Sequence, residues 1–374
     1  MASASAGASR IRFIALGAAL GLSAIEAVGV VVNNASHGGA QDWRVLVNAG
    51  ARAGTRALLH PANATDVFAY PPGFAWALVP FAHLARDTGF WIDAVLMLAC
   101  AVGAALIAAR VYDIGRTWAV VVARGWTPIL NAVAVGQNAT LGLLLAMLTI
   151  VGIVRGSTLL TALPLGLLLY KPTYALPLFA VLAVRGRLRP FALAALGAGL
   201  WYLASVAATG GDWRWPSDWA TMVVRYSSAD FAFNAEKATS LPALLLRRGA
   251  PAWLLASVVV AVLGAVLVAL RRVDILEAAS AACIAGVALS PHAWPYDAAL
   301  AFPMIALAWV RLPQRWQTPA ALIFAVAGPA FLFSSLIGIN PQAIVVVGGT
   351  IAWLIVRLRR PDAARSPERT LRDR

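Results

Sequence analysis

The chain has 374 residues, of which 61% are hydrophobic and only 12% charged, and its mean hydropathy is +0.77. Soluble domains carry roughly a quarter of charged residues, so this composition excludes a water-soluble globular fold. The net charge of +14 would indicate nucleic-acid binding in a soluble protein, but the arginines lie at the ends of apolar runs, where they set membrane topology, so we expect no nucleic-acid partner.

Apolar runs of about 17 to 22 residues alternate with arginine-bearing breaks, and a helix of this length crosses the ~30 Å hydrocarbon layer of a membrane. The first run follows Arg10 and Arg12 and is too long for the apolar part of a signal peptide, so we interpret it as a retained span. The candidate spans are residues 11–32, 89–109, 111–130, 138–154, 157–170, 173–184, 190–208, 251–270, 274–290, 295–310, 318–337 and 341–357. We therefore predict an all-α, polytopic integral membrane protein with about twelve transmembrane helices.

The spans are expected to belong to a single membrane-embedded domain, residues 1–358. Two long polar segments interrupt this domain, residues 33–88 and 209–250, and neither contains a separate soluble domain. A basic cytoplasmic tail, residues 359–374, follows the last span. We expect this tail to be disordered, because it has too few apolar residues to form a core.

The apolar stretch 72–86 either forms a further span or lies in the membrane interface. Its length of about 15 residues and the proline within it, Pro80, favour the interface. The alternating path of the chain then places the short-loop arginines in the cytoplasm, as the positive-inside rule requires. These arginines are Arg10, Arg12, Arg110, Arg116, Arg155, Arg185, Arg187, Arg189, Arg271, Arg272, Arg311 and Arg315. We therefore expect both termini in the cytoplasm and both long loops outside, in the cytoplasmic (inner) membrane of a bacterium.

Three residues inside expected spans need a separate interpretation. Cys100 and Cys283, the only cysteines, both lie in apolar runs, so we expect packing residues and neither a disulfide framework nor a thiolate metal site. Arg124 falls inside the expected span 111–130 and does not fit the arginine pattern. It either has a structural place, in the bundle interior or at a helix break, or a functional one, because charges within membranes are often functional.

Unusual polar clusters collect on the expected outer face, whereas the inner face carries mostly arginine. The clusters are Gln41–Asp42, Tyr70–Pro71–Pro72, Gly136–Gln137–Asn138, Lys171–Pro172, the tryptophan-rich second loop, and Ser290 through Asp297. A random distribution of polar residues would not separate in this way. We therefore expect a functional site at the outer face.

Asp42 and Lys171 each allow two interpretations. Asp42 begins an amphipathic stretch that runs to about Leu59, where it either caps an interfacial helix or, held beside Trp43 at the membrane surface, deprotonates an acceptor hydroxyl as a general base. Lys171 follows an apolar run and precedes Pro172. It either snorkels to the interface or holds a phosphate at headgroup depth, where its charge has a larger effect than in bulk water.

Two further motifs lie where expected spans emerge from the membrane. Gly136–Gln137–Asn138 supplies amide groups, and the segment from Ser290 to Asp297 supplies an imidazole, a phenol and a carboxylate. Both segments are either helix-breaking turns that satisfy freed backbone groups or parts of a site. In the second loop, Trp213, Trp215 and Trp219 either stack on sugar rings or lie in the membrane interface because their rings are amphipathic.

Taken in order, these motifs resemble the polyprenyl-phosphate-mannose-dependent mannosyltransferases of glycosyltransferase family 87, which have the multi-pass C-type glycosyltransferase fold. The resemblance covers most of the chain. It rests on the acidic residue after the first span and on a series of later motifs, which are Phe68–Ala69–Tyr70–Pro71–Pro72, Pro128 with Gly136–Gln137–Asn138, Lys171–Pro172, and Ser290–Pro291 through Tyr296–Asp297. Some members have paired histidines where this chain has Tyr296 and Asp297. That departure leaves the role of the late motif and the identity of the sugar open.

The resemblance implies amphipathic helices in the first outer loop and a hexosyl donor carried on a polyprenyl phosphate, with mannose as the expected sugar. It implies that Asp42 is the catalytic base, which activates a lipid or glycan acceptor for transfer with inversion. The expected donor-phosphate ligands are Lys171, His292 and Arg225, and the expected substrate-binding residues are Tyr70, Gln137, Asn138, Trp294, Tyr296 and Asp297. Nothing in the sequence requires a metal or another cofactor.

Two other classes of protein are compatible with a multi-pass chain. A transporter or lipid flippase also has helix breaks and buried polar residues, but its polar groups should lie near the membrane midplane and its halves are often related by symmetry. Here the polar groups collect on one face, and no symmetry between halves is evident. A membrane scaffold would not need Asp42 or Lys171. The sequence therefore favours the transferase.

Overall fold

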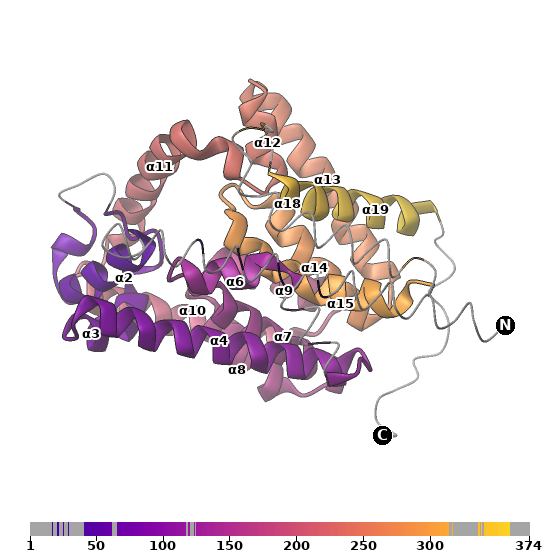
Figure 1. Cartoon of the computed structure of the whole chain (residues 1–374), viewed down its shortest axis with the longest axis horizontal. Helices are drawn as coiled ribbons and strands as arrows, with labels where there is room; N and C mark the ends of the chain where they lie inside the picture. Colours follow the sequence, from indigo (N-terminus) through magenta and orange to yellow (C-terminus); the bar gives the residue numbers. More distant parts are fainter. Residues whose placement is uncertain are drawn as a thin grey trace.

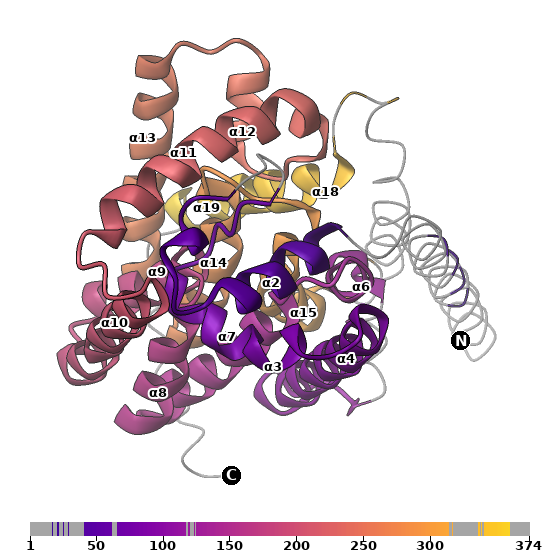
Figure 2. The same cartoon turned by 90° about the vertical axis from the view of Figure 1, so that its left-hand side faces the viewer.

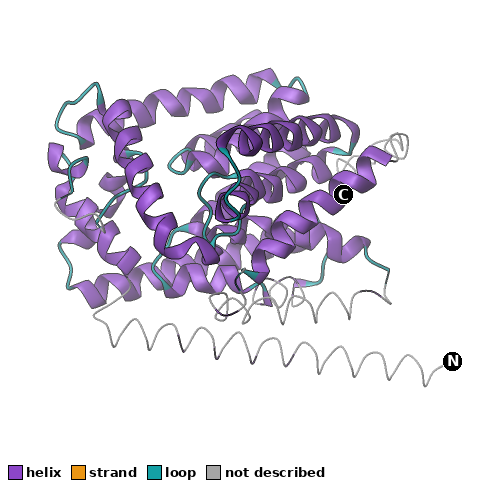
Figure 3. Cartoon of the chain, turned by 90° about the horizontal axis from the view of Figure 1, so that it is seen from above, coloured by secondary structure: helices purple, strands orange, loops and turns teal. Residues whose placement is uncertain are grey.

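The computed structural model describes residues 41–61, 66–116, 125–313 and 340–359, together with a few isolated positions outside these ranges. In this described part every regular element is a helix, as Figure 3 shows, which confirms the all-α prediction. The expected spans 11–32 and 318–337, Arg124 and nearly all of the tail 359–374 lie outside the described residues. The number of about twelve spans and the C-type fold therefore stay predictions.

Four of the described helices are long and apolar enough to cross a membrane. They are α4 (Arg86–Val111), α10 (Leu188–Ala208), α13 (Ala252–Arg272) and the continuous stretch Pro341–Arg359, which is built from α18 (Pro341–Ala343), the π-helical η6 (Ile344–Gly348) and α19 (Gly349–Arg359). All four coincide with expected spans. The apolar runs therefore identify these membrane helices correctly, and the chain is a membrane protein.

Shorter apolar helices form the interior against which these long helices pack. They are α7 (Ala139–Arg155), α8 (Thr158–Leu168), α9 (Pro172–Val184), α14 (Ile275–Leu289) and the pair η4 (Pro295–Ala301) and α15 (Phe302–Arg311). Close helix contact requires small residues: a Cβ on Gly152 of α7 would lie 2.4 Å from the backbone of Thr161 in α8. Figure 1 shows α9 and α14 between α4 and α13, with α8 at the bottom of the view. Their bounds follow the expected spans closely.

The expected span 111–130 is not one continuous helix. The helix α4 ends at Val111, the chain turns through Asp113 with a positive φ of 56°, and α6 (Thr127–Ala134) begins with Pro128 in its first turn. Asp tolerates the left-handed backbone better than most residues, and proline is favoured at a helix start, so both residues mark a break. The apolar composition of this stretch hid that break.

The first long loop contains α2 (Gln41–Arg52), η1 (Arg56–Leu58), η2 (Pro72–Phe74) and α3 (Ala75–Ala82). The stretch 72–86 therefore forms only a short helix, Pro72–Ala82, which is not among the helices long enough to cross a membrane. It lies against α10, because the Gly73 amide donates to Ser205 Oγ at 2.9 Å and the Trp76 indole donates to the Ala204 carbonyl at 3.2 Å.

The second long loop is largely helical, which its polar and tryptophan-rich composition did not suggest. It contains α11 (Trp215–Asn234), η3 (Ala235–Lys237) and α12 (Leu241–Arg247). In Figures 1 and 2, α11 runs from the end of α10 towards α12, on the same side of the bundle as α2. The two long loops therefore lie together at one end of the helix bundle.

Arginine turns and polar motifs lie at opposite ends of the same helices. The helix α7 begins after Asn138 and ends at Arg155, and α9 begins after Lys171 and ends before Arg185. At the arginine end the carboxylate of Glu277 is buried, accepts hydrogen bonds from Arg357 Nε at 2.6 Å and from the Trp353 indole at 2.8 Å, and pairs with Arg311. We call these four residues, Glu277, Arg311, Trp353 and Arg357, the arginine-end cluster.

Candidate functional site

A cavity of about 470 Å³ opens at the end of the bundle that carries the polar motifs. Its walls come from the first turn of α2, the segment before η2, the α6–α7 turn, the start of α9, α11 and the segment before η4. Among the expected catalytic, phosphate-binding and substrate-binding residues, it is lined by Asp42, Tyr70, Gln137, Lys171, His292, Tyr296 and Asp297. The structure therefore gathers motifs spread over about 250 residues of chain into one cavity.

Asp42 is held at this cavity by its neighbour Trp43. Trp43 is fully buried, its ring packs edge-on against Phe81 at 5.4 Å, and its indole N–H donates to the Arg86 carbonyl at 3.1 Å. Asp42 occupies the first turn of α2, where the helix dipole favours a carboxylate. The anchored tryptophan thus fixes the start of α2 and with it the wall that carries Asp42.

The other end of α2 holds the segment that leads to Tyr70. Arg52 pairs with Asp66 at 3.1 Å and donates to its backbone carbonyl at 3.2 Å, and Asn48 donates to the same carboxylate at 3.2 Å. These contacts join Asp66 to α2 across the intervening chain. Since Tyr70 follows four residues later, α2 positions both Asp42 and Tyr70.

Tyr70 connects the first loop to the α6–α7 turn. Its hydroxyl donates to Gln137 Oε1 at 2.6 Å and lies 3.2 Å from Asn138 Oδ1. Burial raises the pKa of Tyr70 well above its ordinary value, and Tyr170, Asp297 and Asp42 raise it further through their charges. Tyr70 is therefore neutral at physiological pH and acts as a hydrogen-bond donor. Asn138 itself does not line the cavity but supports Tyr70 from behind.

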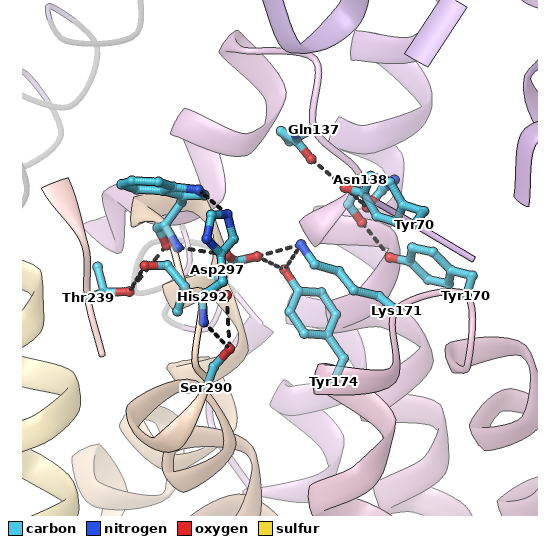
Figure 4. A network of polar contacts seen from close by, with 12 residues as sticks. Tyr70, Gln137, Asn138, Tyr170, Lys171, Tyr174, Thr239, Ser290, His292 and Asp297 are labelled. Atoms are coloured by element: carbon cyan, nitrogen blue, oxygen red, sulfur yellow. Dashed lines mark hydrogen bonds and ion pairs between the residues drawn. The ribbon is translucent and has the colours of Figure 1, made fainter. Parts of the chain in front are cut away.

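Lys171 and Asp297 form an ion pair in the cavity wall, with Lys171 Nζ 2.5 Å from Asp297 Oδ1. The Lys171 ammonium also donates to the Tyr174 hydroxyl at 3.0 Å, and that hydroxyl donates to the same Asp297 oxygen. Figure 4 shows the three side chains pointing toward one another. The lysine side chain is 16% exposed, so it does not extend away to solvent as a snorkelling lysine would.

The segment from Ser290 to Asp297 is folded by its own hydrogen bonds. Asp297 Oδ2 accepts from the Trp294 amide at 2.7 Å, and the Trp294 indole donates to His292 Nε2 at 2.6 Å. This contact fixes the orientation of the imidazole ring. Ser290 Oγ donates to the His292 carbonyl at 2.9 Å. Trp294 is buried and supports His292 without lining the cavity itself.

The cavity also includes residues that the sequence did not single out. Tyr170 and Tyr226 line it, and the Tyr226 ring lies 6.0 Å from the His292 ring. Tyr174 supports it through Lys171 and Asp297, and its place one helical turn after Lys171 is a signal that could have identified it.

Of the second-loop residues singled out from the sequence, one tryptophan lines this cavity and the others lie elsewhere. Only Trp219 of the three tryptophans lines the cavity, because Trp215 is buried against Tyr202 and Trp213 is exposed. Arg225 lines an adjoining cavity of about 500 Å³, which shares Val67 and Tyr226 with the first cavity.

The cavity walls combine a carboxylate, an ammonium–carboxylate pair, an imidazole and several phenols with the apolar side chains of Val45, Leu46 and Val223. Such a wall can bind a polar group joined to an apolar one. In the described ranges no group of three or more His, Cys, Asp or Glu side chains is placed to hold a metal ion.

The family model of glycosyltransferase family 87 matches residues 68–291. This is more than half of the chain. The chain belongs to glycosyltransferase family 87. It is therefore a glycosyltransferase of the membrane, and the transporter and scaffold alternatives are no longer needed to explain the fold. The comparisons with curated proteins and with solved structures gave no match. Asp42 and the segment from His292 to Asp297 lie outside the matched residues. Their assignment to the site therefore rests on their positions in the cavity.

Proposed function

We propose that this enzyme transfers a hexose, mannose in the first instance, from a polyprenyl-phosphate donor to a lipid or glycan acceptor. The observation that carries the proposal is that Asp42 and Lys171, a carboxylate and an ammonium from distant parts of the chain, line the same cavity. Transfer from a sugar phosphate needs a base for the acceptor and a positive charge near the leaving phosphate.

The membrane fold suits a lipid-linked donor. The isoprenoid chain stays in the bilayer while its phosphate and sugar enter the cavity, whose apolar wall residues Val45, Leu46 and Val223 adjoin its polar ones. A soluble sugar nucleotide would not need an enzyme of this composition. Under the positive-inside rule, the short-loop arginines support a cytoplasmic position for their own end of the bundle, so we assign the cavity to the outer face.

In the proposed reaction, Asp42 takes the proton of the acceptor hydroxyl as the acceptor oxygen bonds to the anomeric carbon. The bond between that carbon and the phosphate oxygen breaks, and its electron pair leaves with the lipid phosphate. This single displacement inverts the anomeric configuration. A phosphate is a good leaving group, so the reaction does not require protonation of the leaving oxygen.

The donor phosphate is assigned to Lys171 and His292, which line the cavity together. Lys171 donates one N–H to Asp297 and one to Tyr174, which leaves a third for the phosphate. Arg225 lines the adjoining cavity, so its charge acts on the phosphate at longer range. Tyr70, Gln137, Tyr296 and Trp219 are assigned to the sugar, with Asn138 and Trp294 supporting them.

The direct test is to incubate the purified protein with radiolabelled polyprenyl-phosphate-mannose and membrane lipids and to identify the labelled product. The proposal predicts label in a new lipid or glycan and its absence with Asp42→Asn. Transfer from a sugar nucleotide in place of the lipid-linked donor would contradict the proposal.

A further inference from the structure

The hydrogen bonds of Asp297 leave one acceptor position unused. Its Oδ1 accepts from Lys171 at 2.5 Å and from the Tyr174 hydroxyl, and its Oδ2 accepts from the Trp294 amide at 2.7 Å. An ionised carboxylate has about four lone-pair positions. One position on Oδ2 is therefore available to a ligand in the cavity that Asp297 lines.

Lys171 offers the complementary group beside it. Two of its three N–H bonds go to Asp297 and Tyr174, and its ammonium lies over the rings of Tyr174, Tyr296 and Tyr70 at 4.4, 5.3 and 5.5 Å from their centroids. The pair therefore presents one donor and one acceptor next to each other. This arrangement suits a ligand that carries a bare acceptor oxygen and a hydroxyl on neighbouring atoms.

The burial of this pair argues for a functional reason to keep it. The side chains of Lys171 and Asp297 are 16% and 5% exposed. Removing two charges from water is costly, and buried pairs of this kind are often no more stabilising than apolar residues of the same volume. The pair also joins two walls of the cavity, since Lys171 directly precedes α9 and Asp297 holds the Trp294 amide.

We propose that Asp297 accepts a hydrogen bond from the hydroxyl on the sugar carbon next to the anomeric carbon, and so selects the donor sugar. The inference rests on the proposed function, in which Lys171 donates to the phosphate on the anomeric carbon. The phosphate ester oxygen and this hydroxyl lie on adjacent ring carbons. This spacing matches the neighbouring hydrogen-bond donor of Lys171 and acceptor of Asp297. A hydrogen bond to this hydroxyl strengthens as positive charge develops on the anomeric carbon.

The test measures transfer by the wild-type enzyme from polyprenyl-phosphate-mannose and from its 2-deoxy and 3-deoxy analogues. Loss of a hydrogen bond to a charged group corresponds to roughly a 10- to 100-fold loss of kcat/KM, which we expect for the 2-deoxy donor. The 3-deoxy donor should lose clearly less. Equal losses for the two analogues, or no loss for the 2-deoxy donor, would overturn the assignment of Asp297.

Variants assign the effect to Asp297 itself. In Asp297→Ala and Asp297→Asn, transfer of the normal sugar should be slower, and the penalty for the 2-deoxy donor should fall below about threefold. The control Asp274→Asn, which alters a carboxylate paired with Arg311 at the arginine end of the bundle, should keep the full penalty. A full penalty in the Asp297 variants contradicts the inference alone, whereas no transfer from the mannosyl donor by the wild type contradicts the proposed function.

Discussion

Trp43 and Gly136 are in direct contact, although 93 residues separate them in the sequence. Gly136 has a φ of +71°, and a Cβ built on it would lie 2.8 Å from the Trp43 Cβ. The contact joins the start of α2, which carries Asp42, to the turn that carries Gln137. The two walls of the cavity can therefore approach each other this closely because Gly136 has no side chain.

Gly136→Ala should therefore reduce activity and stability together. Left-handed backbone costs a non-glycine residue about 1–2 kcal/mol, and an added methyl group in a packed contact costs about 1–3 kcal/mol more. Gly156→Ala is the matched control, because Gly156 has a φ of +67° but nothing within 4 Å of its Cβ position. Thermal unfolding and transfer rates should show the larger loss in Gly136→Ala. Equal losses in both variants would mean that the contact with Trp43 has no role.

Lys171→Ala should lower both donor use and stability, because it leaves the Asp297 carboxylate buried without its partner. Breaking a buried pair in this way costs about 3–5 kcal/mol. The double variant Lys171→Ala with Asp297→Ala should recover much of the stability but not the activity. Lys171→Arg, which keeps the charge, should retain more donor use than Lys171→Ala. Native kcat/KM in the double variant would show that the pair is only structural.

The arginine-end cluster should affect folding but not chemistry. Glu277 is 2% exposed and binds Arg311, Arg357 and Trp353, so Glu277→Ala leaves two arginines without their common partner. We expect a lower unfolding temperature in detergent and a reduced yield. The KM for the donor in the folded fraction should be unchanged. A large change in KM with unchanged stability would indicate that this end of the bundle also binds substrate.

The membrane orientation can be measured in intact cells with an impermeant thiol reagent, after Cys100 and Cys283 have been replaced. Cysteine at Trp213, whose side chain is 62% exposed, should be labelled. Cysteine at the exposed Arg189 in the first turn of α10 should be labelled only after the cells are opened. The reverse pattern would place the cavity on the cytoplasmic side and remove the argument for an outer-face enzyme.

The sequence predicted the helices far better than the contacts between them. Runs such as α4 and α13 are apolar for long enough that only a membrane helix explains them, whereas α11 was missed because its tryptophans and polar residues hide its helical period. The pairing of Lys171 with Asp297, across 126 residues, has no local signal at all. It arises only when the starts of α9 and η4 pack side by side.

For the candidate site, too, the sequence predicted part of the arrangement and missed part of it. The order of the motifs indicated a common face, and seven of the ten expected site residues line one cavity. They are Asp42, Tyr70, Gln137, Lys171, His292, Tyr296 and Asp297. Arg225 lines the adjoining cavity instead. Its position depends on which side of α11 faces the first cavity, and the sequence of that helix did not predict this.

The role of Asp42 as the base is tested most directly by the turnover of Asp42→Asn with saturating lipid-linked donor and acceptor. Asn keeps the size of the side chain and caps a helix as well as Asp, but it does not accept a proton at neutral pH. We predict normal insertion and donor binding with a loss of turnover of about 100-fold or more. Asp42→Glu, which keeps the charge but moves the carboxylate, should be intermediate. If the Asn variant binds the donor and transfers sugar at the native rate, Asp42 only caps α2 and the proposed mechanism is wrong.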